Sequence, residues 1–240
     1  MQYLIEANDS AGGAGVTRLF DPDRGCDTFV QRVLRFGPGL SDEQAPSGAD
    51  EVLFVVEGEG ELVTGDARSR LAPGVGAFVP AGSRWRASNE GEGTLAILSV
   101  LVPDPSGTPR DRRPAVLSLL DAELAGATAA RRFRLGATPE VGCESATQFL
   151  GYIPPGRAPD HYHRYDEVVY VVGGEGVLHV EGEEPEPIGP GSCVHLPAGL
   201  VHCLENTGWE DMTVLGVFRP AGSPAEAYYP DGRLATVAEH

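Results

Sequence analysis

The stretch PPGRAPDHYHRYDEVVYVVGGEGVL, residues 154–178, decides the fold, because a closely similar stretch stands earlier in the chain. It aligns with GPGLSDEQAPSGADEVLFVVEGEGEL, residues 37–62. The sequence that follows repeats as well: PGVGAFVPAGSRWRASNEGEG, residues 73–93, aligns with PGSCVHLPAGLVHCLENTGWE, residues 190–210. The offset stays at 116 or 117 positions, so the chain is a tandem duplication.

Each copy has the pattern of short β-strands. EVLFVVEG, from residue 51, and EVVYVVGG, from residue 167, are β-branched and aromatic runs that end in glycine. The 32 glycines and 20 prolines are scattered along the chain, which favours tight turns over long helices. These features predict an all-β fold of the sandwich, barrel or jelly-roll type. The Ala- and Leu-rich stretch SLLDAELAGATAARRFRL, residues 118–135, predicts some helix, so we expect short peripheral helices.

The two copies predict two domains. The stretch DPSGTPRDRR, residues 104–113, is polar and proline-rich, as linkers often are. We therefore expect one domain over residues 1–110 and a second over residues 111–240.

Charge and composition exclude several classes of function. A formal net charge of −17 disfavours binding to nucleic acid or to an anionic membrane surface. We find no apolar run near the length of a membrane span, and the start, MQYLIEANDS, lacks the pattern of a signal peptide. Four dispersed cysteines are too few for a disulfide framework in 240 residues. We expect a cytoplasmic protein with reduced thiols, no nucleic-acid partner and no membrane partner.

Four residues in the second copy have the pattern of a metal site. In an extended strand, residues two apart share a face, so His161, His163, Tyr165 and Glu167 should point the same way. Two imidazoles and a carboxylate that converge from a rigid backbone suit a transition metal ion. His202, just after a Pro-x-Gly turn, can supply a third imidazole from another strand. We predict that His161, His163, Glu167 and His202 are the metal ligands.

The spacing of these residues resembles the two signature motifs of the cupin superfamily, G-x5-H-x-H-x3-4-E-x6-G and G-x5-P-x-G-x2-H-x3-N. The second copy reads Gly156-x4-His161-x-His163-x3-Glu167-x6-Gly174, one residue short in its first gap. It also reads Gly191-x5-Pro197-x-Gly199-x2-His202-x3-Asn206, without departure. The resemblance implies a bicupin: two tandem cupin barrels of the double-stranded β-helix, or jelly-roll, type.

The first copy keeps the glycines of this pattern and loses the ligands. It places Ala45 and Ser47 where the first motif has its histidines, and Trp85 where the second motif has its histidine. Alanine cannot bind a metal, tryptophan offers only an N–H donor, and Glu51 alone would not hold an ion. We therefore predict a first barrel without metal, in which Trp85 fills the vacated space or lines a pocket.

The resemblance also implies a class of activity. We expect one divalent transition metal ion, Fe, Mn or Ni ahead of Cu, Co or Zn, although the ligand types alone do not choose among them. This ligand set is similar to that of quercetinase-like and acireductone-type dioxygenases and of oxalate decarboxylase. We predict a metal-dependent, dioxygenase-type oxidoreductase that acts on a small organic substrate, with Glu167, Tyr165 and His195 as catalytic residues. We also expect a homodimer.

Two other functions stay open at this stage. One is a non-redox metalloenzyme of the bicupin type, such as an isomerase, lyase or aminohydrolase. The other is a metal-containing protein that binds a small molecule. Individual residues also have ordinary alternatives, because Tyr165 and His195 could serve packing alone, and Cys193 and Cys203 fit small buried side chains.

Overall fold

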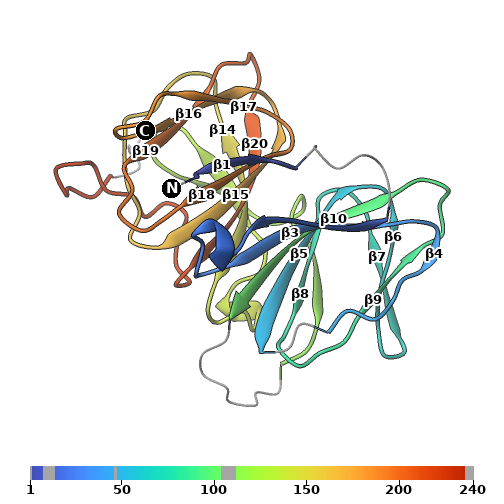
Figure 1. The fold of residues 1–240 in the computed structure, drawn as a ribbon. Helices are drawn as coiled ribbons and strands as arrows, with labels where there is room; N and C mark the ends of the chain where they lie inside the picture. Colours follow the sequence, from blue (N-terminus) through green and yellow to red (C-terminus); the bar gives the residue numbers. More distant parts are fainter. Residues whose placement is uncertain (1, 8–13, 46–47, 104–111, 236–240) are drawn as a thin grey trace. The chain divides into compact units, whose positions relative to one another are not determined.

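The chain forms two compact β-units, each built around one copy of the repeat (Figure 1). The computed structural model describes residues 2–7, 14–45, 48–103 and 112–235. The first unit consists of Ala7–Asp121 and Gly136–Ser145. The second consists of Gln2–Glu6, Ala122–Leu135 and the chain from Ala146 onward.

The first unit has a six-stranded sheet in the order β11-β8-β5-β10-β3-β2 and a four-stranded sheet in the order β4-β9-β6-β7. All the neighbouring strands within them pair antiparallel. The bounds are β2 (Gly15–Phe20), β3 (Val30–Phe36), β4 (Gly39–Leu40), β5 (Ala49–Glu57), β6 (Gly60–Thr64), β7 (Ala67–Leu71), β8 (Val75–Val79), β9 (Arg86–Asn89), β10 (Leu95–Pro103) and β11 (Ala115–Ser118).

The second unit repeats this plan, with a seven-stranded sheet in the order β1-β18-β15-β20-β14-β13-β12 and a three-stranded sheet in the order β17-β16-β19. The bounds are β1 (Leu4–Glu6), β12 (Leu124–Gly126), β13 (Arg132–Leu135), β14 (Thr147–Ile153), β15 (Asp166–Gly173), β16 (Gly176–Val180), β17 (Glu186–Ile188), β18 (Ser192–Leu196), β19 (His202–Asn206) and β20 (Met212–Arg219).

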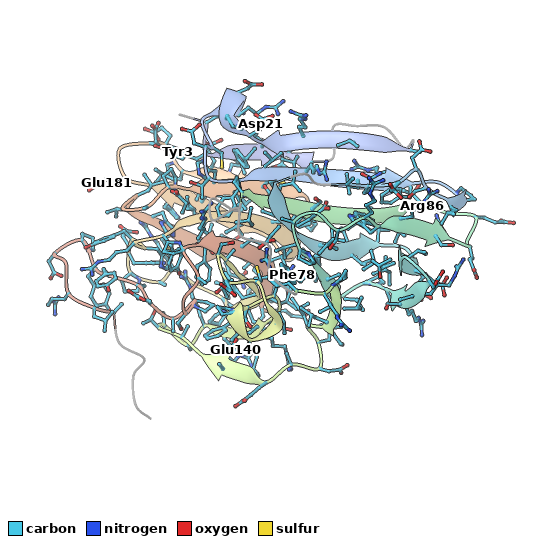
Figure 2. The ribbon with its side chains drawn as sticks, turned by 90° about the horizontal axis from the view of Figure 1, so that it is seen from below. Tyr3, Asp21, Phe78, Arg86, Glu140 and Glu181 are labelled. Atoms are coloured by element: carbon cyan, nitrogen blue, oxygen red, sulfur yellow. The ribbon has the colours of Figure 1, made fainter. Side chains whose placement is uncertain are left out.

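The hydrophobic core of each unit joins its two sheets. In the second unit, Val169 and Val214 of the large sheet pack in one cluster with Leu178 and Leu204 of the small sheet. The first unit has a matching cluster. Buried and half-buried residues alternate along β16 of the small sheet, whereas β5, β10 and β18 of the large sheets are buried along nearly their whole length. Charged side chains such as those of Glu140 and Glu181 lie at the periphery (Figure 2).

Glycine is required at the turn that follows β5 in the first copy and β15 in the second. Gly58 and Gly174 have φ values of 80° and 88°, in the left-handed region that L-residues rarely adopt. A Cβ at Gly174 would also lie 2.8 Å from Met212 Cα, and one at Gly58 would overlap the carbonyl of Thr94. The repeated Gly-x-Gly pattern is therefore a consequence of this tight turn.

The all-β tandem fold expected from the sequence is confirmed, but the helix expected in residues 118–135 is wrong. That stretch contains the antiparallel pair β12 and β13. Among the described residues, the short peripheral helices include the 3-10 turns η2 (Pro22–Arg24) and η3 (Pro139–Val141). Strand pairing outweighs the helical preference of the alanines, because β13 completes the sheet beside β14.

Short segments cross the domain boundary expected between residues 110 and 111. Strand β1, near the N-terminus, pairs with β18 of the second unit (Figure 1). Strand β11 pairs with β8 of the first unit. Within the described residues, no helix is long and apolar enough to cross a membrane. All four cysteines are buried thiols.

Candidate metal centre

Three histidines meet inside the second unit. His161 and His202 exchange backbone hydrogen bonds of 3.0 and 2.8 Å, which place the segment before β15 against the start of β19. His163 follows two residues after His161 and faces the same side, as the sequence spacing predicts. One potential ligand atom from each of the three residues lies within 4.8 Å of the others, and all three residues are buried.

Backbone carbonyls orient the three imidazole rings. The Nδ1 atom of His161 lies 3.0 Å from the carbonyl oxygen of Pro159, that of His163 lies 2.7 Å from the carbonyl of Glu226, and that of His202 lies 2.9 Å from the carbonyl of Leu200. A carbonyl oxygen only accepts hydrogen bonds, so each Nδ1 carries the proton and donates it. Each Nε2 therefore keeps its lone pair for a ligand.

Burial keeps these imidazoles neutral. It lowers the pKa of His161 to about 3, with the nearby Arg131 guanidinium as the next cause. Burial likewise lowers the pKa of His163 to about 4 and that of His202 well below its usual value of 6.5. Neutral imidazole is the form that binds metal ions. The donor atoms and their protonation therefore fit a divalent transition metal ion.

Glu167 lines the same pocket as the histidines but lies outside their compact group of ligand atoms. It stands on β15 opposite Leu196 of β18, and both side chains face the pocket. Burial raises the pKa of Glu167 to about 8, and the Arg131 guanidinium partly offsets that rise. A cation beside this carboxylate would restore its ionised form.

Tyr165 is stacked between two aromatic rings at the edge of the centre. Its ring lies 4.6 Å from that of His163, nearly parallel, and 4.0 Å from that of Phe218. Burial raises the pKa of the phenol well above 10, so the hydroxyl stays protonated. The sequence placed Tyr165 correctly on the face of the ligands, and the stacking gives it a role in holding His163.

The structure does not bring His195 to this centre. On β18 its neighbours Val194 and Leu196 face the core and the pocket, so His195 points to the opposite face. It pairs across the sheet with Val168, whereas the inward-facing Glu167 pairs with Leu196. The prediction of His195 as a catalytic residue therefore gains no support from its position.

Sequence reasoning missed Arg131, which enters the pocket from the turn between β12 and β13. Its Nη1 atom lies 3.4 Å from Nε2 of His161, and its Nη2 atom donates to the carbonyl of Leu204 over 2.9 Å. The turn, Thr128–Arg131, has φ values of 55° and 56° at Ala129 and Ala130, as a type I′ hairpin turn requires. Alanines rarely occupy such positions, so the sequence carries no turn signal there.

The segment that follows β20 is held beside the histidines by backbone hydrogen bonds and ring stacking. Tyr162 and Tyr228 exchange backbone hydrogen bonds of 2.9 Å each, and their rings stack at 5.5 Å. The Arg164 guanidinium lies 4.0 Å from the centre of the Tyr228 ring. Through the carbonyl of Glu226, this segment also orients His163. The histidine motif is thus completed by a segment more than 60 residues away.

The pocket above the histidines is small and mostly apolar. Its volume is about 80 Å³, and much of its wall consists of Phe133, Phe149, Ile153 and Val214. An apolar cavity of about 150 Å³ can hold benzene, so this pocket suits a substrate of only a few non-hydrogen atoms. The apolar wall limits the access of water to the centre.

The first unit fills the equivalent place with a hydrogen-bond network of its own. Glu51, the counterpart of Glu167, is fully buried and accepts hydrogen bonds from Arg32 at 2.9 Å and from Trp85 Nε1 at 2.8 Å. The hydroxyl of Ser99 donates to the same carboxylate. An internal guanidinium therefore supplies the positive charge that a metal ion would supply in the second unit, which explains how the carboxylate can remain buried.

In the first unit, one of the residues at the ligand positions differs from the residue that the sequence alignment gave. Gln44 forms a bridge with Trp85 just as His161 does with His202. Gln44, not Ala45, therefore occupies the position of His161, because the extra residue of the first copy lies after position 44. Ser47 lies outside the described residues.

The fold and the centre define a protein of two β-barrels, one of which carries a three-histidine cluster. The chain belongs to the cupin family, whose cupin-domain model matches residues 32–101 and 149–218, more than half of the chain. The two matches fall one in each unit, so the chain is a tandem cupin.

Relatives and solved structures agree with this assignment. L-ectoine synthase from Vibrio atlanticus is 35% identical over 72 residues, which cover 30% of this chain and 56% of the synthase, so the chain spans little more than half of that relative. Protein Ylba from E. coli has a TM-score of 0.73 at 13% identity, covering 90% of this chain and 89% of Ylba. A variant of Bacillus subtilis oxalate decarboxylase has a TM-score of 0.73 at 13% identity, covering 92% of this chain and 78% of the decarboxylase. The two structural likenesses show the fold.

Proposed function

We propose that this chain is a metal-dependent enzyme that acts on a small organic substrate in the second barrel, as a dioxygenase-type oxidoreductase. In this proposal His161, His163, His202 and Glu167 hold one divalent transition metal ion, with Fe, Mn or Ni ahead of Cu, Co or Zn. When bound, the ion supplies Lewis-acid and electron-transfer chemistry to a substrate and to dioxygen.

One observation carries this proposal. The three imidazoles each donate their Nδ1 proton to a backbone carbonyl, which leaves three Nε2 lone pairs directed into a small, mostly apolar pocket. Carbonyl groups that fix the tautomer and orientation of imidazole rings are typical of metal sites. A set of histidines that served packing alone would not need this common orientation.

The residues around the centre have distinct tasks in this proposal. The stacked ring of Tyr165 holds His163 in place, and its protonated hydroxyl is available as a hydrogen-bond donor. The apolar wall, including Phe149, keeps bulk water from the reacting groups. Glu167 would compensate part of the charge of a bound ion, and its carboxyl group, whose pKa burial raises to about 8, can hold a proton.

The metal and the reaction are tested in two steps. Elemental analysis of protein purified without added metal should find about one equivalent of Fe, Mn or Ni. Oxygen uptake is then measured with small enols, diketones and carboxylates, and a substrate that consumes dioxygen in proportion to its turnover would support the dioxygenase. Anaerobic turnover of the same compounds, with no oxygen uptake in metal-loaded protein, would contradict the redox assignment.

A non-redox reaction is the second candidate, and one observation favours it. The relative that is 35% identical over 72 residues has the name of a synthase, not of an oxygenase. The same metal centre could activate a substrate for isomerisation, elimination or hydrolysis, with Glu167 as the base. Anaerobic turnover is the result that would favour this candidate.

The quaternary structure and the cellular location expected from the sequence also stay proposals. We propose a homodimer, which light scattering of the purified protein would test. We propose a cytoplasmic location, which fractionation of the source cells would test.

A further inference from the structure

Arg131 is a positive charge inside the pocket whose hydrogen bonds are incomplete. Its Nη2 atom donates to the carbonyl of Leu204 and lies 3.9 Å from Cys203 Sγ, its Nη1 atom approaches His161, and its buried Nε atom has no hydrogen-bond partner. Glu167 interacts with the guanidinium electrostatically, but none of the described carboxylates forms a direct ion pair with it. A guanidinium so placed lacks the directly bonded carboxylate that buried arginines normally have.

A metal ion at the histidines would increase this imbalance. Nη1 of Arg131 lies 3.4 Å from Nε2 of His161, the atom that would bind the ion, so the guanidinium and the ion would be close neighbours of like charge. A divalent ion, the carboxylate of Glu167 and the guanidinium would leave a buried site with two net positive charges. A negatively charged group that contacts both cations would relieve the repulsion.

We propose that Arg131 binds a carboxylate group of the substrate, and that the substrate of this centre is a small carboxylic acid in its ionised form. This inference rests on the proposed function, since it assigns the substrate class of the same site. The planar guanidinium matches the two oxygens of a carboxylate, and its Nε–H is the donor that the protein itself leaves without a partner. Arg131 is therefore a residue that determines specificity.

The rest of the pocket fits such a substrate. Beyond the guanidinium and the ligands, the wall is formed by side chains such as Phe133, Phe149 and Val214, which suit a short carbon skeleton. The volume of about 80 Å³ limits that skeleton to a few atoms. The neighbouring Arg132 differs from Arg131, because its guanidinium is half-exposed and forms an ion pair with Asp211.

The turn that carries Arg131 holds it in place. Ala129 and Ala130 both adopt positive φ, a conformation unfavourable for alanine, directly before Arg131. The positive φ values follow from the type I′ turn and fix the direction in which Arg131 leaves the hairpin. The unpartnered Nε is the observation that indicates a binding role for Arg131.

The inference is tested by titration of the metal-loaded protein with propionate and with its neutral analogue propionamide, followed by calorimetry. The wild type should bind propionate at least about tenfold more tightly than propionamide. Arg131→Met should reduce that preference roughly tenfold, and Arg131→Lys, which keeps the charge but loses the planar fork, should reduce it to a smaller extent. Arg233→Met removes an exposed arginine of the same unit and should change nothing.

Metal content is measured on the same samples, so that the two proposals can fail separately. Protein with one equivalent of metal whose preference for propionate is unchanged in both Arg131 variants would overturn this inference and leave the proposed function standing. Protein that holds no metal would contradict the proposed function instead. The titration of that metal-free protein would then decide the inference, because Arg131 alone must still produce a preference for the carboxylate.

Discussion

At the scale of single residues, the centre depends on how each imidazole is held, and not only on which residues are histidines. Three backbone carbonyls, of Pro159, Leu200 and Glu226, accept the Nδ1 protons. Two of these carbonyls come from the residue two positions before the histidine that they orient, and the third comes from a distant segment. The side chain thus supplies the ligand atom, and the local backbone supplies its orientation.

Replacement of His161 with alanine should remove the metal. The variant should fold, since the hydrogen bonds between residues 161 and 202 are made by the backbone, but its affinity for Mn or Fe should fall by at least roughly 100-fold because one of three imidazoles is lost. Metal content after dialysis measures the effect. His179→Ala is the matched control, because His179 pairs with Glu205 outside the pocket and should retain full metal binding. A His161→Ala variant that keeps a full equivalent would contradict the ligand assignment.

The metal-free protein should lose stability as the pH falls from 7 towards 5. Burial lowers the pKa of His161 to about 3, that of His163 to about 4 and that of His202 well below 6.5, so only the unfolded chain takes up protons on these residues near pH 6.5. Burial raises the pKa of Glu167 to about 8, which opposes the trend because the folded state then holds one extra proton. The balance favours protonation of the unfolded state, and the free energy of unfolding should fall by about 1 to 3 kcal/mol per pH unit.

Urea unfolding of chelator-treated protein at pH 7 and pH 5 checks this dependence. His161→Asn removes one of the buried imidazoles, so its stability should vary less steeply with pH. A free energy of unfolding that stays constant or rises between pH 7 and pH 5 would contradict the assignment of the histidines as buried and neutral.

At the scale of elements, the hairpin of β12 and β13 decides what the pocket contains. It covers the edge of the large sheet beside β14 and carries Arg131 in its turn. Its composition, rich in alanine, favours a helix, but a helix would leave the edge of β14 unpaired. Pairing along the sheet therefore determines the structure of this stretch, and the charge in the pocket follows from it.

Glycine at either turn position of this hairpin should stabilise the protein. Ala129 and Ala130 have φ values of 55° and 56°, which glycine adopts without steric conflict, so Ala129→Gly should raise the free energy of unfolding by about 0.5 to 1 kcal/mol. Chemical denaturation measures the change. Ala125→Gly, in the extended strand β12, is the control and should lower stability by a similar amount. A less stable Ala129→Gly variant would show that the turn carries no such strain.

At the scale of the whole molecule, the two copies of the repeat balance the charge of a buried carboxylate in different ways. Each unit buries a carboxylate at the same position of the repeat, Glu51 in the first and Glu167 in the second. In the first unit Arg32 pairs with it, whereas the second unit has Phe149 at the position of Arg32 and a cluster of histidines for an ion. The carboxylate of the first unit is thus neutralised without a metal ion, and the three-histidine cluster lies in the second unit.

Loss of the internal cation should therefore destabilise the first unit strongly. Arg32→Met leaves Glu51 buried without its guanidinium, and we expect the free energy of unfolding to fall by about 3 to 5 kcal/mol. Denaturant unfolding gives the value. The control is Arg70→Met, which breaks a solvent-exposed pair with Glu59 and should stay within about 1 kcal/mol of the wild type. Equal effects of the two substitutions would contradict the role of Arg32 as the replacement for a metal ion.

Much of this arrangement could be predicted from the sequence because its signals are local. The repeat, the Gly-x-Gly turns and the alternation through His161, His163, Tyr165 and Glu167 all depend on spacing along one strand, so the all-β tandem fold and the candidate ligands followed from it. The position of His195 could not be predicted in this way, because which residues of β18 face the pocket depends on how that strand pairs with β15.

The sequence by itself determined the duplicated all-β fold, the candidate ligands and the loss of those ligands in the first copy. Only the tertiary structure decided that Arg131 stands beside His161, that Glu226 orients His163 and that Arg32 pairs with Glu51. The physical reason is distance along the chain. Local spacing determines which side chains share a face, but the charges that meet in a buried pocket are set by pairing between segments 19 to 63 residues apart.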